Sequence, residues 1–368
     1  MKNYLNFETD IKNLEEELDK LKDPYNQEGL TEVDTNKISI TQSELSSKLQ
    51  DIYSNLDPWQ IALVARHEDR PKSKFFIDNL FDNFVALSGD RFYGEDQSVV
   101  AGFGLFDGKS VMIIGQEKGE DLESRIKHNF GSMRPEGYRK TIRLMRLADK
   151  FNIPCINFID TAGAYPGVGS EERGIAESIA RSIECCMELK VPTISIIIGE
   201  GGSGGAIALA SSNKVIMLEN AIYSVISPEG CATILWRDPK KTLEAAKAMK
   251  LSAKDLLELK VIDEIIEEPL GGAHRDRDLI LENVRKSLKK NLSEFESMDG
   301  NEIFMHRKNK FLSIGRSNGF INRSENIDTM IMKENNIDIL ITKIKKYKNQ
   351  LSIFFSFAIL FVFLIYFL

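Results

Sequence analysis

The stretch "GEGGSGGA", residues 199–206, decides how this chain folds, and it raises the question of what its glycines do. It places five glycines within seven residues, directly after the apolar run "VPTISIII". Glycine loses more conformational freedom on folding than any other residue, so such a cluster indicates a requirement of the backbone. We considered a flexible linker, a phosphate-binding loop, the turn of a serine nucleophile, and a backbone surface that holds an anion.

The first two explanations disagree with the neighbouring residues. A linker is implausible because apolar strand-like and helix-like segments adjoin the glycines on both sides. A Walker-type phosphate loop requires Lys and Ser or Thr after its second glycine, whereas Ala206 and Ile207 follow here. Gly199, Gly201 and Gly204 have the G-x-G-x-x-G spacing of dinucleotide-binding folds, but this spacing alone is a weak signal among so many glycines, and we do not favour it.

The serine explanation rests on Gly201, Ser203 and Gly205, which satisfy the G-x-S-x-G pattern of hydrolases. A catalytic triad would also need a downstream acid and histidine, and only His274 and His306 lie downstream. The pattern is easily met within so many glycines. A serine hydrolase or peptidase using Ser203 therefore stays an alternative and is not the favoured hypothesis.

The remaining explanation is an oxyanion site made of peptide N–H groups. A helix that begins at Ala206 would direct its unpaired first N–H groups toward a ligand. Losing one such donor costs catalysis about 3–4 kcal/mol. The turn "DTAGAYPGVG", residues 160–169, follows the preceding strand and has the same character. Tight helix–strand packing would also tolerate glycine, but two such turns in succession favour the anion site.

The segments around these turns repeat one pattern of buried strand, glycine turn and helix. The strands are expected at "IPCINFID", "VPTISIIIG" and "KVIMLEN". "SVVAGFGLF" and "SVMIIGQEKG" flank Asp107-Gly108, which predicts a β-hairpin. The succession predicts an α/β fold, and such folds place their sites at the carboxyl ends of strands.

The first part of the chain is predicted to be helical. Leucine and isoleucine side chains recur at spacings of three and four over residues 1–56, which indicates a helical hairpin broken near "DPYNQEG". We expect residues 1–70 to serve subunit contacts. A further helix is expected after "RPKSK", with its apolar side formed by Phe75, Phe76, Leu80, Phe84 and Leu87.

Composition excludes several classes of function. The net charge of −7 disfavours a nucleic-acid-binding protein. The four cysteines show no C-x-x-C spacing, so they are expected to be buried thiols of a reducing compartment rather than ligands of a metal. The N-terminus has no apolar signal-peptide region, and a cytoplasmic location is expected.

The C-terminal part differs in composition from the rest of the chain. Residues 321–350 are predicted to be a linker or helical stalk, and residues 351–368, "LSIFFSFAILFVFLIYFL", contain no charged residue. That length just allows a membrane-spanning helix, and the preceding lysines would keep its flank cytoplasmic. We expect the segment to tether the chain to the inner face of a membrane, the alternative being an extension that never inserts.

Several long motifs in this sequence resemble one family. They include "FIDTAGAYPGVGSEERGIAESIA", "GEGGSGGAIA", "YSVISPEGCATILW", "NFGSMRPEGYRKTIRLM" and "EPLGGAHRD". The chain resembles the alpha subunits of bacterial acetyl-CoA carboxylase carboxyltransferases from about residue 4 to 320. Ala162 stands where many relatives have proline, which loosens the turn without removing a functional group.

The resemblance implies a crotonase-like fold, a spiral of strand-turn-helix units, over residues 71–320. It implies transfer of a carboxyl group from carboxybiotin to acetyl-CoA, giving malonyl-CoA in fatty acid biosynthesis. Biotin would arrive on a biotin carboxyl carrier protein served by an ATP-dependent biotin carboxylase. A homologous beta subunit would complete an α2β2 assembly and supply the zinc ribbon, so no metal is expected in this chain. A non-catalytic scaffold is the remaining alternative.

The resemblance also assigns roles to the two glycine turns. The N–H groups of Gly204, Gly205 and Ala206 would be the oxyanion donors, and no side-chain base would be required. The biotin side would be lined by Gly163, Ala164, Tyr165, Gly167, Gly201 and Gly202, although Tyr165 packing without a ligand is equally compatible. Arg134, Arg139 and Arg143 could meet CoA phosphates or an acidic partner, but a salt-bridged surface is the commoner explanation for such residues.

Overall fold

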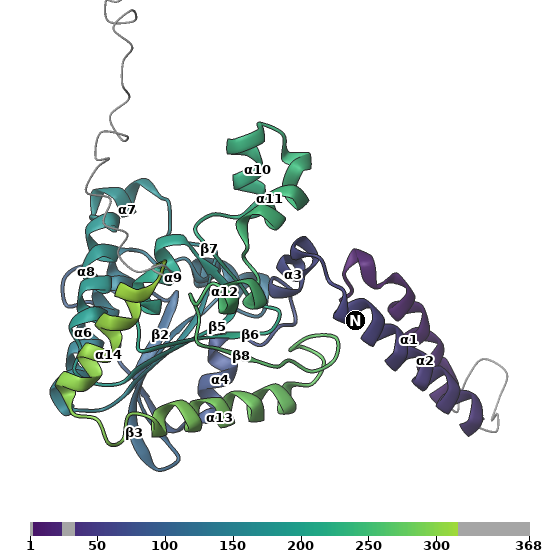
Figure 1. The fold of residues 1–368 in the computed structure, drawn as a ribbon, viewed down its shortest axis with the longest axis horizontal. Coiled ribbons are helices and arrows are strands. Elements are labelled where there is room, and N and C mark those ends of the chain that lie inside the picture. The colour runs from purple at the N-terminus through teal and green to yellow at the C-terminus, as the bar shows by residue number, and fades with distance from the viewer. Residues whose placement is uncertain (1–2, 24–33, 316–368) are drawn as a thin grey trace, which may run out of the picture. The chain divides into compact units, whose positions relative to one another are not determined.

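The computed structural model describes residues 3–23 and 34–315, which form one mixed β-sheet covered by helices (Figure 1). Neighbouring strands follow the order β1-β2-β3-β4-β5-β6-β8, and β7 pairs with the end of β5. The pairs β1–β2 and β2–β3 are antiparallel, and every pair from β3 onward is parallel. The α/β class predicted from the strand-turn-helix pattern is confirmed.

The antiparallel part contains the predicted hairpin. Strands β2 (Val99–Phe106) and β3 (Lys109–Gln116) pair in full register around Asp107 and Gly108. Both turn residues have positive φ, 47° and 77°, as the tight turn of a twisted two-residue hairpin requires. The local turn chemistry therefore fixes this part of the sheet.

The parallel part holds the two strands that end in glycine turns. Strands β4 (Cys155–Thr161) and β5 (Thr193–Gly202) are adjacent, and almost every residue in them is buried. Such continuous burial is typical of parallel strands covered on both faces. The remaining strands of this part are β6 (Lys214–Leu218), β7 (Ile222–Ser224) and β8 (Glu264–Ile266).

Two groups of helices cover the sheet on opposite sides (Figure 1). Helices α6 (Pro135–Phe151), α8 (Ile175–Glu188) and α14 (Gly300–Ser313) form one group. Helices α4 (Ser73–Leu80) and α13 (Arg277–Ser293) form the other. The short helices are α5 (Leu122–Lys127), α7 (Val168–Glu172), α9 (Ser203–Ala210), α10 (Pro228–Trp236), α11 (Thr242–Met249) and α12 (Ala253–Glu258). All four cysteines are buried and free, as expected.

One expected helix is wrong in its second half. Helix α4 ends at Leu80, and the chain continues as strand β1 (Asp82–Ala86), which pairs with β2. Phe84 and Leu87 therefore do not lie on the apolar side of a helix. Their spacing fitted a helix, but pairing with the edge of the sheet prevails, and the register shifts next to Asn83, whose φ is 50°.

The N-terminal helical hairpin is present as predicted. Helices α1 (Thr9–Lys22) and α2 (Thr35–Ser54) pack through Ile11, Leu18, Leu45 and Leu49, and α3 (Pro58–Ala65) leads into the core. Arg275 joins the hairpin to the core, with ion pairs to Glu8 and Glu15.

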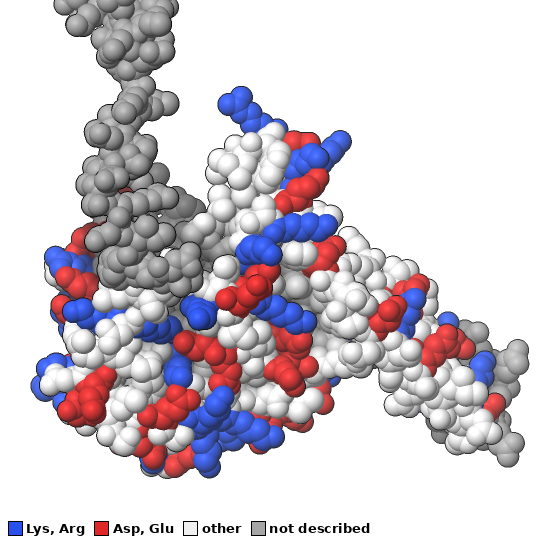
Figure 2. Space-filling view, viewed as in Figure 1, with Lys and Arg blue, Asp and Glu red and all other residues white. Residues whose placement is uncertain are grey.

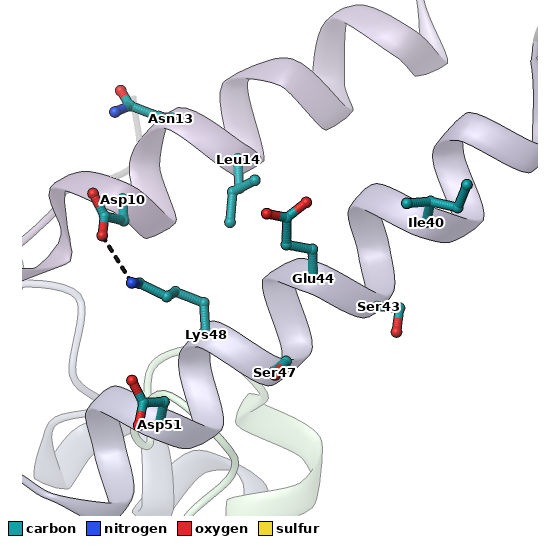
Figure 3. Close-up of a pocket in the computed structure, with 9 residues that line it drawn as sticks. All are labelled: Asp10, Asn13, Leu14, Ile40, Ser43, Glu44, Ser47, Lys48 and Asp51. Atoms are coloured by element: carbon teal, nitrogen blue, oxygen red, sulfur yellow. Dashed lines mark ion pairs between the residues drawn. The ribbon is translucent and has the colours of Figure 1, made fainter.

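A groove of about 870 Å³ runs along the outside of this hairpin (Figure 3). Asp10 of α1 and Lys48 of α2 form a 3.0 Å ion pair across it. Its lining is acidic and hydroxyl-bearing and contains no residue of either glycine turn. The groove is therefore separate from the predicted site.

Residues 316–368 form a second unit of the chain, outside the described residues. The predicted stalk at 321–350 and the apolar helix at 351–368 fall there and stay predictions. Among the helices that are described, none combines the length and the apolar character needed to cross a membrane.

Candidate active site

The two glycine turns lie side by side at one edge of the sheet. Strands β4 and β5 are parallel neighbours, and Thr161 pairs with Gly201 at the point where both strands end. A Cβ atom on Gly202 would overlap the carbonyl group of Ala162 in the neighbouring turn. The glycines are thus needed because two backbones approach each other too closely for side chains.

Helix α9 begins at the glycine turn, one turn earlier than the sequence predicted. It follows β5 without a loop, and no side chain caps it at Gly202. The first N–H groups of a helix have no partner within that helix. Gly204 and Gly205 are the second and third residues of this helix, so their N–H groups have no partner within it and are of the kind expected of an oxyanion site. Ala206 lies four residues after the N-cap Gly202, so its N–H makes the first bond inside the helix and, contrary to the prediction, is not a free donor.

A buried glutamine fixes the far side of this helix start. Gln116, at the end of β3, donates from its Nε2 atom to the carbonyl oxygen of Gly205 at 2.8 Å. Gln116 is completely buried, so the bond is protected from water. The peptide groups of the turn are therefore held in place before any ligand arrives, which is what electrostatic catalysis requires.

The other turn is ordered by its own bonds. The hydroxyl of Thr161 donates to the carbonyl of Gly163 at 2.8 Å, and the N–H of Gly163 donates to that hydroxyl at 3.1 Å. Tyr165 donates its N–H to the carbonyl of Met133 at 3.0 Å. Its ring lies 4.8 Å from the guanidinium of Arg134, which brings two of the predicted residues together.

Ser203 sits between these turns with a φ of 49°, a left-handed backbone that is uncommon for serine. The two downstream histidines lie elsewhere: His274 stacks on His67, and His306 packs against Phe295. Within the described structure neither histidine hydrogen-bonds Ser203. The geometry thus gives Ser203 no general base of the kind that the hydrolase alternative requires.

A network of buried charges lies directly behind the glycine turn. Lys118, which follows β3, forms ion pairs of 2.6 Å with Glu200 and 2.9 Å with Asp160. The N–H of Glu200 also donates to Asp160 at 3.0 Å, so the ends of three strands are joined. Burial opposes the charge on Glu200, but Lys118 and Arg66 outweigh it and lower its pKa to about 2. Glu200 is therefore ionised at any pH near neutrality.

This network was not predicted from the sequence. Lys118, Asp160 and Glu200 are far apart in the chain, and each belongs to a common residue type. One signal was available, because Asp160 and Glu200 are charged residues at the ends of two otherwise apolar strands. Charges at such positions are seldom left unpaired in a folded core.

The predicted arginines all have partners within the chain. Arg139 pairs with Asp90 at 2.9 Å, and its NH1 atom donates to the carbonyl of Arg173 at 3.1 Å. Arg143 donates to the carbonyls of Ser88 and Gly89. These contacts are those of a salt-bridged surface, and a role of Arg134, Arg139 and Arg143 toward CoA stays a prediction. Within residues 3–23 and 34–315, no cluster of His, Cys, Asp and Glu could hold a metal ion.

Comparisons with known proteins agree with the resemblance. The acetyl co-enzyme A carboxylase carboxyltransferase-like family matches residues 4–315. The chain is 75% identical over 360 residues to the acetyl-coenzyme A carboxylase carboxyl transferase subunit alpha of Pelagibacter ubique, covering 98% of both chains. It is 52% identical over 317 residues to the Brucella ovis protein of that name, covering 86% of this chain and 100% of the relative.

Solved structures show the same fold at low identity. Transcarboxylase 12S matches with a TM-score of 0.51 at 19% identity, covering 61% of this chain and 41% of that one. A chain of a Pseudomonas malonate decarboxylase hetero-tetramer matches with a TM-score of 0.53 at 14% identity, covering 66% of this chain and 96% of that one. The crotonase-like fold expected from the motifs is confirmed. Together with the match over residues 4–315, these relatives show that the chain belongs to the acetyl co-enzyme A carboxylase carboxyltransferase family, among its alpha subunits.

Proposed function

We propose that the chain transfers a carboxyl group from carboxybiotin to acetyl-CoA, giving malonyl-CoA, as one subunit of a larger enzyme. Biotin is carried on a separate biotin carboxyl carrier protein, which a biotin carboxylase loads using ATP. A beta subunit completes the site in an α2β2 assembly. This reaction is the first committed step of fatty acid biosynthesis.

One observation carries the proposal: the uncapped start of helix α9 lies against a second glycine turn. The N–H groups of Gly204 and Gly205, which have no partner within the helix, donate to a ligand oxygen that carries negative charge. A Cβ on Gly163 would meet nothing closer than the Cβ of Ser203, 3.9 Å away, so there is space beside these donors. Such a cradle fits the carbonyl oxygen of a biotin ureido ring.

The remaining residues of the two turns orient the ligand and exclude water. Gly163, Ala164, Tyr165 and Gly167 are half-buried and form one side, and Gly201 and Gly202 form the base. When bound, carboxybiotin supplies the carboxyl group that is transferred. This chain contributes fixed dipoles and a shaped surface, since the hard chemistry belongs to the group it binds.

The test uses the full chain with and without a bacterial beta subunit of the same enzyme. The measured reaction is the biotin-dependent decarboxylation of malonyl-CoA, with biocytin as the biotin probe. We expect activity only with the beta subunit, and we expect Ser203→Ala to keep it within about threefold because a backbone site does not use the hydroxyl.

The other two hypotheses give different results in the same assay. Activity without the beta subunit that disappears in Ser203→Ala would establish a serine hydrolase. If no mixture decarboxylates malonyl-CoA, although sedimentation shows that the two subunits assemble, the chain would be a non-catalytic scaffold. Either result would overturn the proposal.

A further inference from the structure

Helices α10 and α11 form a lobe that projects from the body beside α3 (Figure 1). We define the α10–α11 lobe as residues 228–249. It carries large apolar side chains that face solvent, with Ile234 and Leu235 each 67% exposed and Trp236 41% exposed. Lys and Arg side chains mark its outer end (Figure 2). Exposed apolar surfaces of this kind often bind a ligand or a partner. To do so beside the candidate site, the lobe must be held in a fixed position.

The apolar attachment of the lobe is shallow. Among the described residues, the lobe contributes Ala246 and the partly buried Met249 to the apolar cluster that joins it to α3. The rest of that cluster lies outside the lobe and includes Ala62 and Ala65 of α3 with the larger Ile222 and Leu251. The lobe itself therefore buries little apolar area at this attachment, and a polar contact can add to its fixed position.

One side chain makes that contact. Arg66, which ends α3, donates from NH1 to Glu229 of α10 at 2.6 Å. In the described part of the chain, this is the single polar contact that side chains of the lobe make outside the lobe. The other carboxylate oxygen of Glu229 is buried and has no hydrogen-bond partner among those residues.

The same guanidinium reaches the glycine turn. Its Nε atom donates to Glu200 at 2.6 Å, and Glu200 directly precedes Gly201. The side chain of Arg66 is 25% exposed and that of Glu200 is 10% exposed, so this arm is screened little by water. An arginine can hold two carboxylates at once because its donors form a rigid planar fork.

We propose that Arg66 is a positioning residue that holds the α10–α11 lobe at a fixed place relative to the glycine turn, so that the lobe forms one wall of the site. This inference rests on the proposed function. Arg66 contacts the lobe through Glu229 and the glycine turn through Glu200. Because Lys118 also pairs with Glu200, loss of Arg66 releases the lobe while the turn keeps one cation.

The experiment compares Arg66→Ala, Glu229→Gln and the double variant in the assembled enzyme with biocytin as the probe. We expect each single variant to raise KM for biocytin about two- to fivefold with kcat within about twofold, because the side chain of Glu229 is 45% exposed and such a pair contributes at most about 1 kcal/mol. The double variant should be no worse than Arg66→Ala, since both remove the same link. Arg66→Lys keeps the charge but lacks the fork, so it should restore KM only in part.

Hydrogen exchange supplies a readout independent of activity. Amides of residues 228–249 should exchange faster in Glu229→Gln than in the wild type, and amides of β4 and β5 should not change. The matched control is Lys241→Gln, which removes an exposed ion pair to Glu244 inside the lobe and should alter neither exchange nor KM. Unchanged exchange in Glu229→Gln, or a fall in kcat at constant KM, would overturn the inference. An inactive wild-type enzyme would instead overturn the proposed function, and the exchange data would still report on Arg66.

Discussion

Gly205 approaches Gly163 so closely that a Cβ atom on Gly205 would lie 2.8 Å from the carbonyl carbon of Gly163. This separation is shorter than any that real Cβ atoms show, and the atom it meets is backbone. The helix start that carries the donors and the turn beside it therefore form one unit.

This contact predicts that alanine substitutions at two adjacent glycines will lower kcat to very different extents. Gly205→Ala should push the two turns apart and lower kcat about a hundredfold, because catalytic groups displaced by about 1 Å lose that much. Gly204→Ala is the matched control, since its added methyl would meet only the flexible side chain of Ile179, at 3.3 Å. It should stay within about tenfold of the wild type. Steady-state kinetics of the assembled enzyme measure both, and equal losses would contradict the close contact as the cause.

The stacked histidines predict a loss of stability in weak acid. His67 and His274 have ring centroids 3.8 Å apart. Burial, with help from the neighbouring cationic groups, lowers the pKa of His274 to about 3. As the pH falls below the unfolded value of about 6.5, the unfolded chain binds a proton that the folded chain excludes. Stability is therefore present above that value and is lost as the pH approaches 3.

Urea unfolding at several pH values measures this effect. Between about pH 7 and pH 5, His274 should account for a loss of about 2 kcal/mol in the free energy of unfolding. The variant His274→Gln should show a flatter dependence over that range, whatever its stability at neutral pH. A dependence as steep as that of the wild type would show that His274 titrates normally.

Removing the donors of Arg307 on α14 should lower the stability of the fold considerably. Its side chain is completely buried and donates to the carbonyls of Leu189 and Val191 at 2.6 and 2.8 Å. Arg307→Met leaves these carbonyls unpaired and should lower the free energy of unfolding by about 3–5 kcal/mol. Arg307→Lys supplies one donor group and should recover part of it. Denaturant titration of the three proteins is the measurement, and a loss under about 1 kcal/mol in Arg307→Met would contradict this role.

Replacing Lys118 in the network behind the glycine turn should also lower the free energy of unfolding. Lys118→Met leaves Asp160 and Glu200 buried with too little positive charge, and we expect a loss of about 3 kcal/mol in the free energy of unfolding. Lys74→Met is the control, because Lys74 pairs with Asp78 on the surface and its removal should matter little. Equal effects of the two changes in thermal unfolding would show that burial of the network contributes nothing.

Features that depend on neighbouring residues could be predicted from the sequence. The Asp107-Gly108 turn determines its hairpin because both residues tolerate positive φ, and apolar runs ending in glycine determine β4 and β5. The helix expected to reach Leu87 was wrong for a related reason. The spacing of its apolar residues was locally consistent with a helix, and only pairing with β2, further along the chain, decides the outcome.

Features that depend on distant residues could not be predicted. Nothing near Gly205 in the sequence shows that Gly163 will lie against it, and nothing near Arg66 shows that it will meet both Glu200 and Glu229. These relations arise from the register of parallel strands and the path of α3. Gly204 and Gly205 could be proposed as donors from the sequence because a helix start has unpaired N–H groups wherever it occurs, and they stay a prediction. Ala206 was wrong as an unpaired group because the helix begins three residues earlier than expected.

The hydrogen bonds from Arg307 to Leu189 and Val191 also have a consequence for folding during synthesis. The carbonyls that Arg307 binds precede β5 by only a few residues, yet their donor is translated more than a hundred residues later. Until the ribosome has made α14, the carbonyl oxygens of Leu189 and Val191 lack this buried donor. A nascent chain that already contains both glycine turns would thus still lack part of its core, and stable assembly with partner subunits should wait for α14.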